Sequence, residues 1–428
     1  MNEAAFDDTI KKKELGFMDL IFLGLGCIIG SGVFVILGKT IKFGGKYTLA
    51  SFIIVAVLSL IMGYCYIEIY SRYKSDITEY LAVKNNIGEK TGKVTLWILY
   101  LFSVFSAITV VVSLTKYIGK NGMNLFKNNA MIEIGFSVLL IVIMTGINLA
   151  GIKTSKVVCN SIGIVMLLIL GGIILFGGNR ICINKIKNGP KVKWDSFVLA
   201  TILALFLFNG YDVLIKMSND SKDENDTKKA LVWSVISTGI IYLLVIIVGI
   251  CVMGYGKISN TYHPISMIYE FLINKKFGLV VYILGAIILF NTAFLTLIGA
   301  SRFLYGLARE KEIMFSDKLS VVDKNNTPTN AIYATFGLSV LSALLNNEVI
   351  LAVFTNFSVM YILIVVSISV LIIRWKERDN KKEQEEHNYI RGNIKNIPVP
   401  VVISLIVMVY FMIIILKNKF WLGNKNVM

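Results

Sequence analysis

Long apolar runs separated by short polar segments constrain this chain more than any other feature. Eleven such runs lie near residues 17–38, 47–70, 94–118, 131–150, 157–178, 194–216, 230–254, 278–303, 330–346, 349–373 and 398–416. A bilayer core needs about 20 apolar residues of helix, and lipid offers no partner to backbone amides. We therefore predict an all-α membrane protein with about eleven transmembrane helices.

Composition supports the membrane class and excludes several others. Hydrophobic residues make up 56% of the 428-residue chain and charged residues only 16%, and the mean hydropathy is +0.71. The net charge of +16 arises from Lys and Arg that flank the apolar runs, where such residues anchor helices and meet anionic head groups. We expect a lipid bilayer as the surrounding partner and no nucleic acid.

The residues that usually build catalytic or metal centres are sparse. The cysteines are Cys27, Cys65, Cys159, Cys182 and Cys251, and the histidines are His263 and His387. Four cysteines lie inside apolar runs and none forms a C-x-x-C motif, so we interpret them as small apolar residues rather than as a disulfide framework or metal site. We expect no metal, no cofactor and no enzymatic activity.

The charge distribution suggests an orientation and a division of the chain. Lys and Arg are more numerous in the segments that face the cytoplasm when the N-terminus is inside, which predicts a multi-pass protein of the cell membrane with a cytoplasmic N-terminus. The expected parts are a cytoplasmic tail (1–16), a ten-helix core (17–373, with halves 17–178 and 194–373), a cytoplasmic loop (374–397) and an additional helix with a short tail (398–428).

The first run contains residues that a plain lipid-facing helix does not need. Gly24, Gly26, Gly30 and Gly32 surround Ser31 at the middle of the run, and each glycine costs a helix about 1 kcal/mol relative to alanine. The chain can unwind here if the bared backbone lines a cavity. The alternative is close helix packing, because Gly26 and Gly30 form a G-x-x-x-G pair.

The sixth run has a second such feature. Asn209-Gly210 is a turn dipeptide, and Asp212 is an ionisable group well inside the run. Charges inside a membrane are expensive and mark functional sites, so Asp212 is a candidate for coupling or gating. The alternative is neutralisation by Lys216, four residues further along the same helix face.

The two features occupy corresponding runs of two five-helix halves. Matching interruptions of this kind indicate a transporter with inverted repeats. A broken helix presents free N–H groups with partial positive charge at the start of its second part and free C=O groups at the end of its first part. Two breaks side by side would suit a zwitterionic amino acid, with its carboxylate at the N–H groups.

At these residues the sequence resembles the amino acid–polyamine–organocation transporter superfamily. The resemblance covers roughly residues 14 to 415 and rests on four motifs in order. They are Gly-Cys-Ile-Ile-Gly-Ser-Gly-Val-Phe at 26–34, Gly-Ile-Lys-Thr-Ser at 151–155, Phe-x-Phe-Asn-Gly-Tyr-Asp at 206–212, and Ser-Arg-x-x-Tyr-x-x-Ala-Arg-Glu at 301–310 followed by Thr327-Pro328.

The resemblance implies a LeuT-like core of five plus five inverted helices, with discontinuous helices 1 and 6 and alternating access around a central site. It implies that Gly30, Ser31 and Gly32 hold the substrate carboxylate and that backbone carbonyls face the ammonium. Phe206 would be the aromatic gate over the substrate, although a core aromatic is the alternative. The implied substrate-binding set is Ile28, Ile29, Gly30, Ser31, Gly32, Phe206, Phe208 and Asn209.

One departure from the family pattern concerns coupling. Many proton-coupled or sodium-independent relatives carry a lysine in span five, where this chain has Met166. We expect secondary active transport of an amino acid, by proton symport or by exchange, with possible proton coupling. The alternatives are a polyamine or organic-cation permease, which would need more acids than Asp212, and a transport-inactive membrane sensor.

Overall fold

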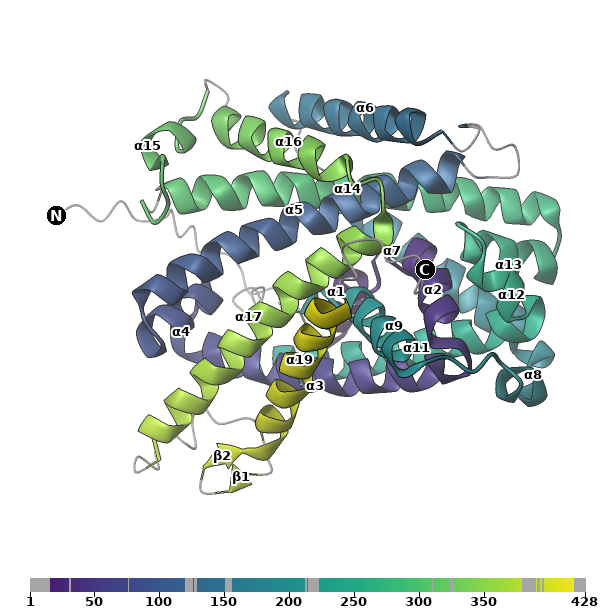
Figure 1. Ribbon diagram of the computed structural model, residues 1–428, viewed down its shortest axis with the longest axis horizontal. Helices are drawn as coiled ribbons and strands as arrows, with labels where there is room; N and C mark the ends of the chain where they lie inside the picture. The colour runs from purple at the N-terminus through teal and green to yellow at the C-terminus, as the bar shows by residue number, and fades with distance from the viewer. Residues whose placement is uncertain are drawn as a thin grey trace.

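The computed structural model shows one bundle of helices (Figure 1). It describes residues 16–30, 32–75, 77–119, 126, 129–150, 156–211, 214, 223–309, 311–323, 327–378, 390, 393–394 and 396–418. Within these ranges the only strands are β1 (Asn393–Ile394) and β2 (Ile397–Pro398), which pair antiparallel. The prediction of an all-α protein is therefore confirmed, apart from this short hairpin.

Helices follow one another along the chain with short connections. In order they are α1 (Phe17–Ile28), α2 (Gly32–Gly44), the 3-10 helix η1 (Gly45–Tyr47), α3 (Thr48–Tyr73), α4 (Thr78–Asn86), α5 (Glu89–Gly119), α6 (Ala130–Leu149), α7 (Lys156–Gly177), the 3-10 helix η2 (Gly178–Arg180), α8 (Ile183–Lys187), α9 (Trp194–Leu207), α11 (Glu224–Met253), α12 (Tyr255–Ser259), α13 (Pro264–Leu272), α14 (Lys275–Arg309), α15 (Ser316–Leu319), α16 (Thr329–Ala343), α17 (Glu348–Lys376) and α19 (Val399–Asn418).

The described part of the chain contains 8 helical stretches that are long and apolar enough to cross a membrane. Two shorter apolar helices, α1 and α9, accompany them. Ten of the eleven predicted runs overlap these helices. The run 330–346 overlaps only α16, a helix of 15 residues. The protein is thus an α-helical membrane protein, while the number of spans and the five-plus-five repeat remain predictions.

The longest helices set the long axis of the bundle, and short helices gather at its two ends. In Figure 1, α5 and α14 run side by side along this axis, with α4 and α15 near one end and α8, α12 and α13 near the other. The chain turns between α2 and α3 at Gly45, whose φ of +50° favours glycine. The segment between α12 and α14 contains the short helix α13.

Polar side chains link the apolar helices to one another. The hydroxyl of Thr115 on α5 lies 2.8 Å from that of Ser137 on α6. Thr201 on α9 donates to Ser51 on α3 at 3.1 Å, and the amide of Asn356 on α17 donates to the carbonyl of Ile202 at 2.7 Å. Such bonds between helices are stabilising in a membrane because few other partners are available.

A fully buried ion pair joins α3 to α17. The guanidinium of Arg374 contacts both carboxylate oxygens of Glu68, with Nε 3.0 Å from Oε2, and neither side chain is exposed. The amide of Ile390 also donates to Glu68 at 2.9 Å. The backbone of Ile390 is therefore docked on this ion pair.

Candidate functional site

The first predicted helix break is present in the structure. Helix α1 ends at Ile28, Ile29 leaves the helical conformation with ψ of 86°, and α2 begins at Gly32. The amide of Gly30 donates to the carbonyl of Ile28 at 2.9 Å. The Gly30 amide is therefore already engaged, so a carboxylate bound there would have to open or share this contact.

The glycines around this break do not pack as a G-x-x-x-G pair. Among the residues that the structure describes, none has an atom within 4 Å of a Cβ added at Gly26 or Gly30. Gly24 packs closely instead, because a Cβ added there would lie 2.3 Å from the hydroxyl oxygen of Ser234 on α11. The described residues therefore give no support to close packing of Gly26 with Gly30.

The second predicted break also begins where the sequence suggests. Helix α9 ends at Leu207, and residues 208–210 form a turn in which Gly210 has a φ of +116°. The hydroxyl of Tyr242 on α11 donates to the carbonyl of Leu207 at 3.0 Å. One of the carbonyl groups that the helix end leaves free thus receives a side-chain partner.

The two helix ends touch each other at two points. The ring of Phe206 lies against the first residue of α2, because a Cβ atom added at Gly32 would be 3.3 Å from that ring. A Cβ added at Gly210 would lie 2.3 Å from the carbonyl oxygen of Cys27, near the end of α1. The approach at Gly210 requires a glycine, while the contact at Gly32 is tight, and together they show that the fold brings both interruptions to one place.

The remaining predicted site residues fall into three groups. Ile28, Ile29 and Phe206 are buried at the junction. Phe208 is also fully buried, but its ring packs between those of Phe52 and Tyr242, with centroids 6.2 Å and 5.5 Å away. Ser31 and Asp212 lie outside the described residues.

Asn209 is the polar side chain that the described structure places at the junction. It is half-buried, and its Nδ2 is enclosed without a hydrogen-bond partner among the described residues. Buried donors of this kind are normally satisfied. The Asn209 amide is therefore a donor that a polar ligand could use.

A charged cluster that was not predicted from the sequence joins three helices near one end of the bundle. The carboxylate of Glu348, the first residue of α17, contacts the ammonium of Lys116 on α5 and lies 3.5 Å from that of Lys39 on α2. The Lys39 ammonium also lies 4.4 Å from the ring centre of Tyr262. Charges at helix ends resemble ordinary interfacial anchors in a sequence, so their convergence gave no signal.

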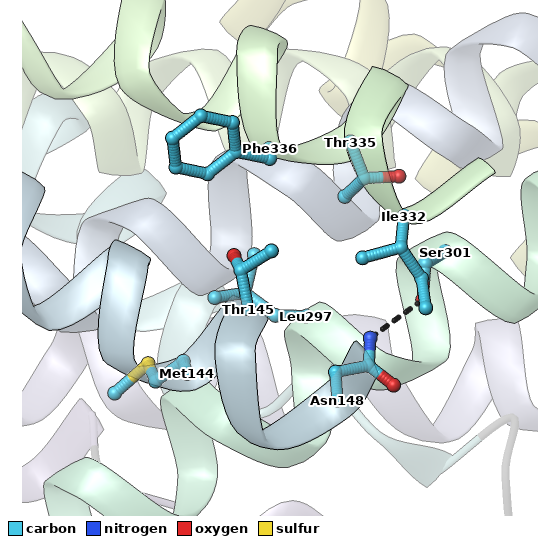
Figure 2. A pocket seen from close by; sticks show the side chains of 8 residues that line it. All are labelled: Met144, Thr145, Asn148, Leu297, Ser301, Ile332, Thr335 and Phe336. Carbon is cyan, nitrogen blue, oxygen red and sulfur yellow. Dashed lines mark hydrogen bonds between the residues drawn. The ribbon is translucent and has the colours of Figure 1, made fainter. Parts of the chain in front are cut away.

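The pocket shown in Figure 2 lies elsewhere, between α6, α14 and α16. Its cavity of about 10 Å³ is lined by Met144, Thr145, Asn148, Leu297, Ser301, Ile332, Thr335 and Phe336. Asn148 donates to Ser301 across it at 3.1 Å. This volume holds about one water molecule, so the pocket is too small for an amino acid.

The architecture and the paired helix ends define an integral α-helical membrane protein with an interrupted core. The chain belongs to the amino acid permease family, whose model matches residues 15–419. Family membership identifies it as a transporter of a small molecule rather than an enzyme, and the match spans both helix breaks.

Three relatives from Bacillus subtilis illustrate the range of this similarity. The chain is 25% identical over 396 residues to the branched-chain amino acid permease BcaP, covering 86% of this chain and 82% of that protein. It is 23% identical over 390 residues to the serine/threonine exchanger SteT, with 88% and 86% covered. It is 24% identical over 389 residues to a methylthioribose transporter, with 86% and 83% covered.

Proposed function

We propose that this protein carries a neutral amino acid across the cell membrane by alternating access around the junction of α1, α2 and α9. The observation that supports this most is the double contact between the interrupted helices, Gly32 against Phe206 and Gly210 against Cys27. This contact places the start of one helix beside the ends of two others, next to Gly30.

The charges of an α-amino acid match the poles of these helix ends. The start of α2 presents amide groups and the positive end of a helix dipole, which favour a carboxylate. The end of α1 presents carbonyl groups, which favour an ammonium. The Nδ2 of Asn209, which has no partner among the described residues, is a further donor for the carboxylate.

The side chains at the junction favour a substrate with an uncharged side chain. Ile28, Ile29, Phe206 and Leu207 are apolar and buried, and a charged substrate side chain placed among them would lose its hydration without gaining a partner. The similarity to a branched-chain amino acid permease and to a serine/threonine exchanger supports the same class.

The transport cycle would depend on Phe206 and on the charged cluster of Lys39, Lys116 and Glu348. Movement of the Phe206 ring away from Gly32 would open the junction. Separation of Lys39 from Glu348 would release α2 from α17, since this ion pair joins them at 3.5 Å. We place the N-terminus in the cytoplasm and Asp212 in gating or coupling.

An uptake screen tests the proposal. Purified protein in liposomes that are preloaded with the same six solutes in unlabelled form is offered radiolabelled leucine, valine, serine, lysine, glutamate and putrescine. The proposal predicts uptake of one or more of the neutral amino acids and little uptake of lysine, glutamate or putrescine. Uptake of putrescine alone would contradict it, and so would the absence of uptake of all six from protein that is folded.

Liposomes that contain the same protein separate symport from exchange. A proton symporter accumulates label in empty liposomes when the outside is more acidic than the inside. An exchanger accumulates label only when the liposomes are preloaded with unlabelled substrate. Met166 occupies the position where proton-coupled or sodium-independent relatives carry a lysine, so any proton coupling here would need another group, and this measurement decides between symport and exchange.

A further inference from the structure

Two cysteines that are 69 residues apart in the chain meet at one end of the bundle. The amide of Cys182 donates to the Sγ of Cys251 at 3.0 Å, and that thiol lies 3.3 Å from the carbonyl oxygen of Cys182. Both cysteines are free thiols. Their separation in the sequence gives no indication of this meeting.

These cysteines lie where the connection between α7 and α9 is tied to the end of α11. We call residues 181–193 of this connection the strap. Lys185 of the strap donates to the carbonyl of Cys251 at 2.7 Å, and Tyr255 donates to the carbonyl of Ile186 at 3.0 Å. The amide of Lys46, just after α2, donates to the carbonyl of Pro190 at 3.1 Å. The strap therefore connects the end of α11 to the end of α2.

We propose that Cys182 and Cys251 are an oxidisable pair whose disulfide fastens the strap to α11. The Sγ of Cys251 reaches the backbone of Cys182, so the two Cα atoms lie within about 7 Å of each other. Disulfide-linked Cα atoms are usually about 4.4–6.8 Å apart. A small change in side-chain rotation can therefore bring the two sulfur atoms together.

The reaction is a thiol–disulfide exchange with a disulfide donor such as glutathione disulfide. The half-buried Cys182 attacks first as a thiolate and breaks the S–S bond of the donor, which releases one glutathione thiolate. The thiolate of Cys251, buried at 3% exposure, then displaces the second glutathione. The two protein thiols lose two protons and two electrons, and the donor becomes two molecules of glutathione.

The placement of the pair gives it access to an oxidising compartment. The strap follows α7, and in the orientation proposed above this end of the bundle faces the outside of the cell. Disulfides form and persist in such compartments. The pairing itself does not depend on the substrate, so it stands or falls separately from the transport proposal.

Peptide mass analysis of the purified full-length protein tests the pairing. The protein is treated with glutathione disulfide and digested without reduction. The expected result is a cross-linked peptide that joins Cys182 to Cys251, disappears after reduction with dithiothreitol, and is absent from Cys182→Ser. The melting temperature should rise on oxidation in the wild type but not in Cys182→Ser, because the disulfide restrains the unfolded chain.

Two further cysteine variants serve as controls. Cys251→Ser preserves a hydrogen-bonding side chain at the buried position and should fold without forming the cross-link, and Cys182→Ala provides a second variant at the more accessible position. Recovery of both cysteines as free thiols or as separate glutathione adducts from folded wild-type protein would overturn the proposal. In that case the contact would be only a hydrogen bond.

Discussion

The hydroxyl of Tyr242 donates a hydrogen bond at 3.0 Å to the carbonyl oxygen of Leu207, the last residue of α9. Both residues are buried, so water cannot replace this bond easily. The ring of Tyr242 also packs against Phe208 in the turn that follows. One side chain of α11 thus holds both the last carbonyl of α9 and the first residue beyond it.

Tyr242→Phe should lower the stability of the folded protein, because it removes the hydrogen bond to the end of α9 and keeps the ring contacts. Loss of a hydrogen bond that leaves a buried carbonyl unpaired costs about 1–3 kcal/mol, so the melting temperature in detergent should fall. Tyr333→Phe, at an exposed position on α16, is the matched control and should melt like the wild type. Equal melting temperatures for both variants would show that the bond does not support the end of α9.

Gly210→Ala should disrupt the contact between the two helix breaks. The new Cβ would combine an unfavourable φ of +116° with an approach of 2.3 Å to the carbonyl oxygen of Cys27. Gly88→Ala, with a φ of +144° and nothing within 4 Å of the added Cβ, imposes the backbone strain alone, about 1–3 kcal/mol. Gly210→Ala should therefore lose more thermal stability and more transport than Gly88→Ala. Equal losses would indicate that the contact with α1 is unimportant.

Breaking the buried ion pair between Glu68 and Arg374 should be severely destabilising. Removal of one partner leaves an uncompensated buried charge at a cost of about 3–5 kcal/mol, so Glu68→Met and Arg374→Met should each lower the melting temperature strongly. The double variant should be more stable than the sum of the single effects predicts. The exposed pair of Glu89 and Lys93, 2.9 Å apart, provides the control, because Glu89→Gln should have no measurable effect. Strictly additive effects at Glu68 and Arg374 would contradict this account.

Acidic pH should destabilise the loop before α13 through His263. Burial lowers the pKa of this imidazole below its usual 6.5, partly opposed by the charge of Glu270, and the ring packs edge-on against those of Tyr117 and Tyr282. Below about pH 6.5 the unfolded chain binds a proton that the folded protein resists, so stability is full above this pH and falls as the pH is lowered through the depressed folded pKa. His263→Phe should not show this loss of stability at acidic pH. Its melting temperature should therefore change less between pH 7.5 and pH 5 than that of the wild type. An unchanged pH profile in His263→Phe would assign the acid sensitivity to other groups.

Local sequence patterns were enough to predict the helices and the places where they are interrupted. Apolar runs of spanning length predict helices because the bilayer leaves no alternative, and the glycines at 30 and 32 and the Asn209-Gly210 turn marked where α1 and α9 end. The ends of the runs were less certain, since α14 extends from Lys275 to Arg309, beyond the predicted 278–303. Polar residues at a span end can continue a helix into the interface, and hydropathy does not detect this.

Contacts between distant segments were not predictable. The cluster of Lys39, Lys116 and Glu348 and the meeting of Cys182 with Cys251 depend on how helices pack, and no local pattern encodes that packing. Each residue has an ordinary explanation when considered alone. Gly26 shows the opposite limitation, because its G-x-x-x-G spacing with Gly30 suggested close packing, whereas no described residue packs against a Cβ added there.

Substrate binding to Gly30→Leu would test the central claim most directly, because this position has space for a side chain and no unfavourable φ. The variant should fold, and the new side chain should occupy the place proposed for the substrate. Its affinity for the amino acid identified by the uptake screen should fall by about tenfold or more, which corresponds to about 1.4 kcal/mol. Gly135→Leu, at an exposed position on α6, should bind like the wild type. Wild-type affinity in folded Gly30→Leu would contradict a binding site at the junction of α1, α2 and α9.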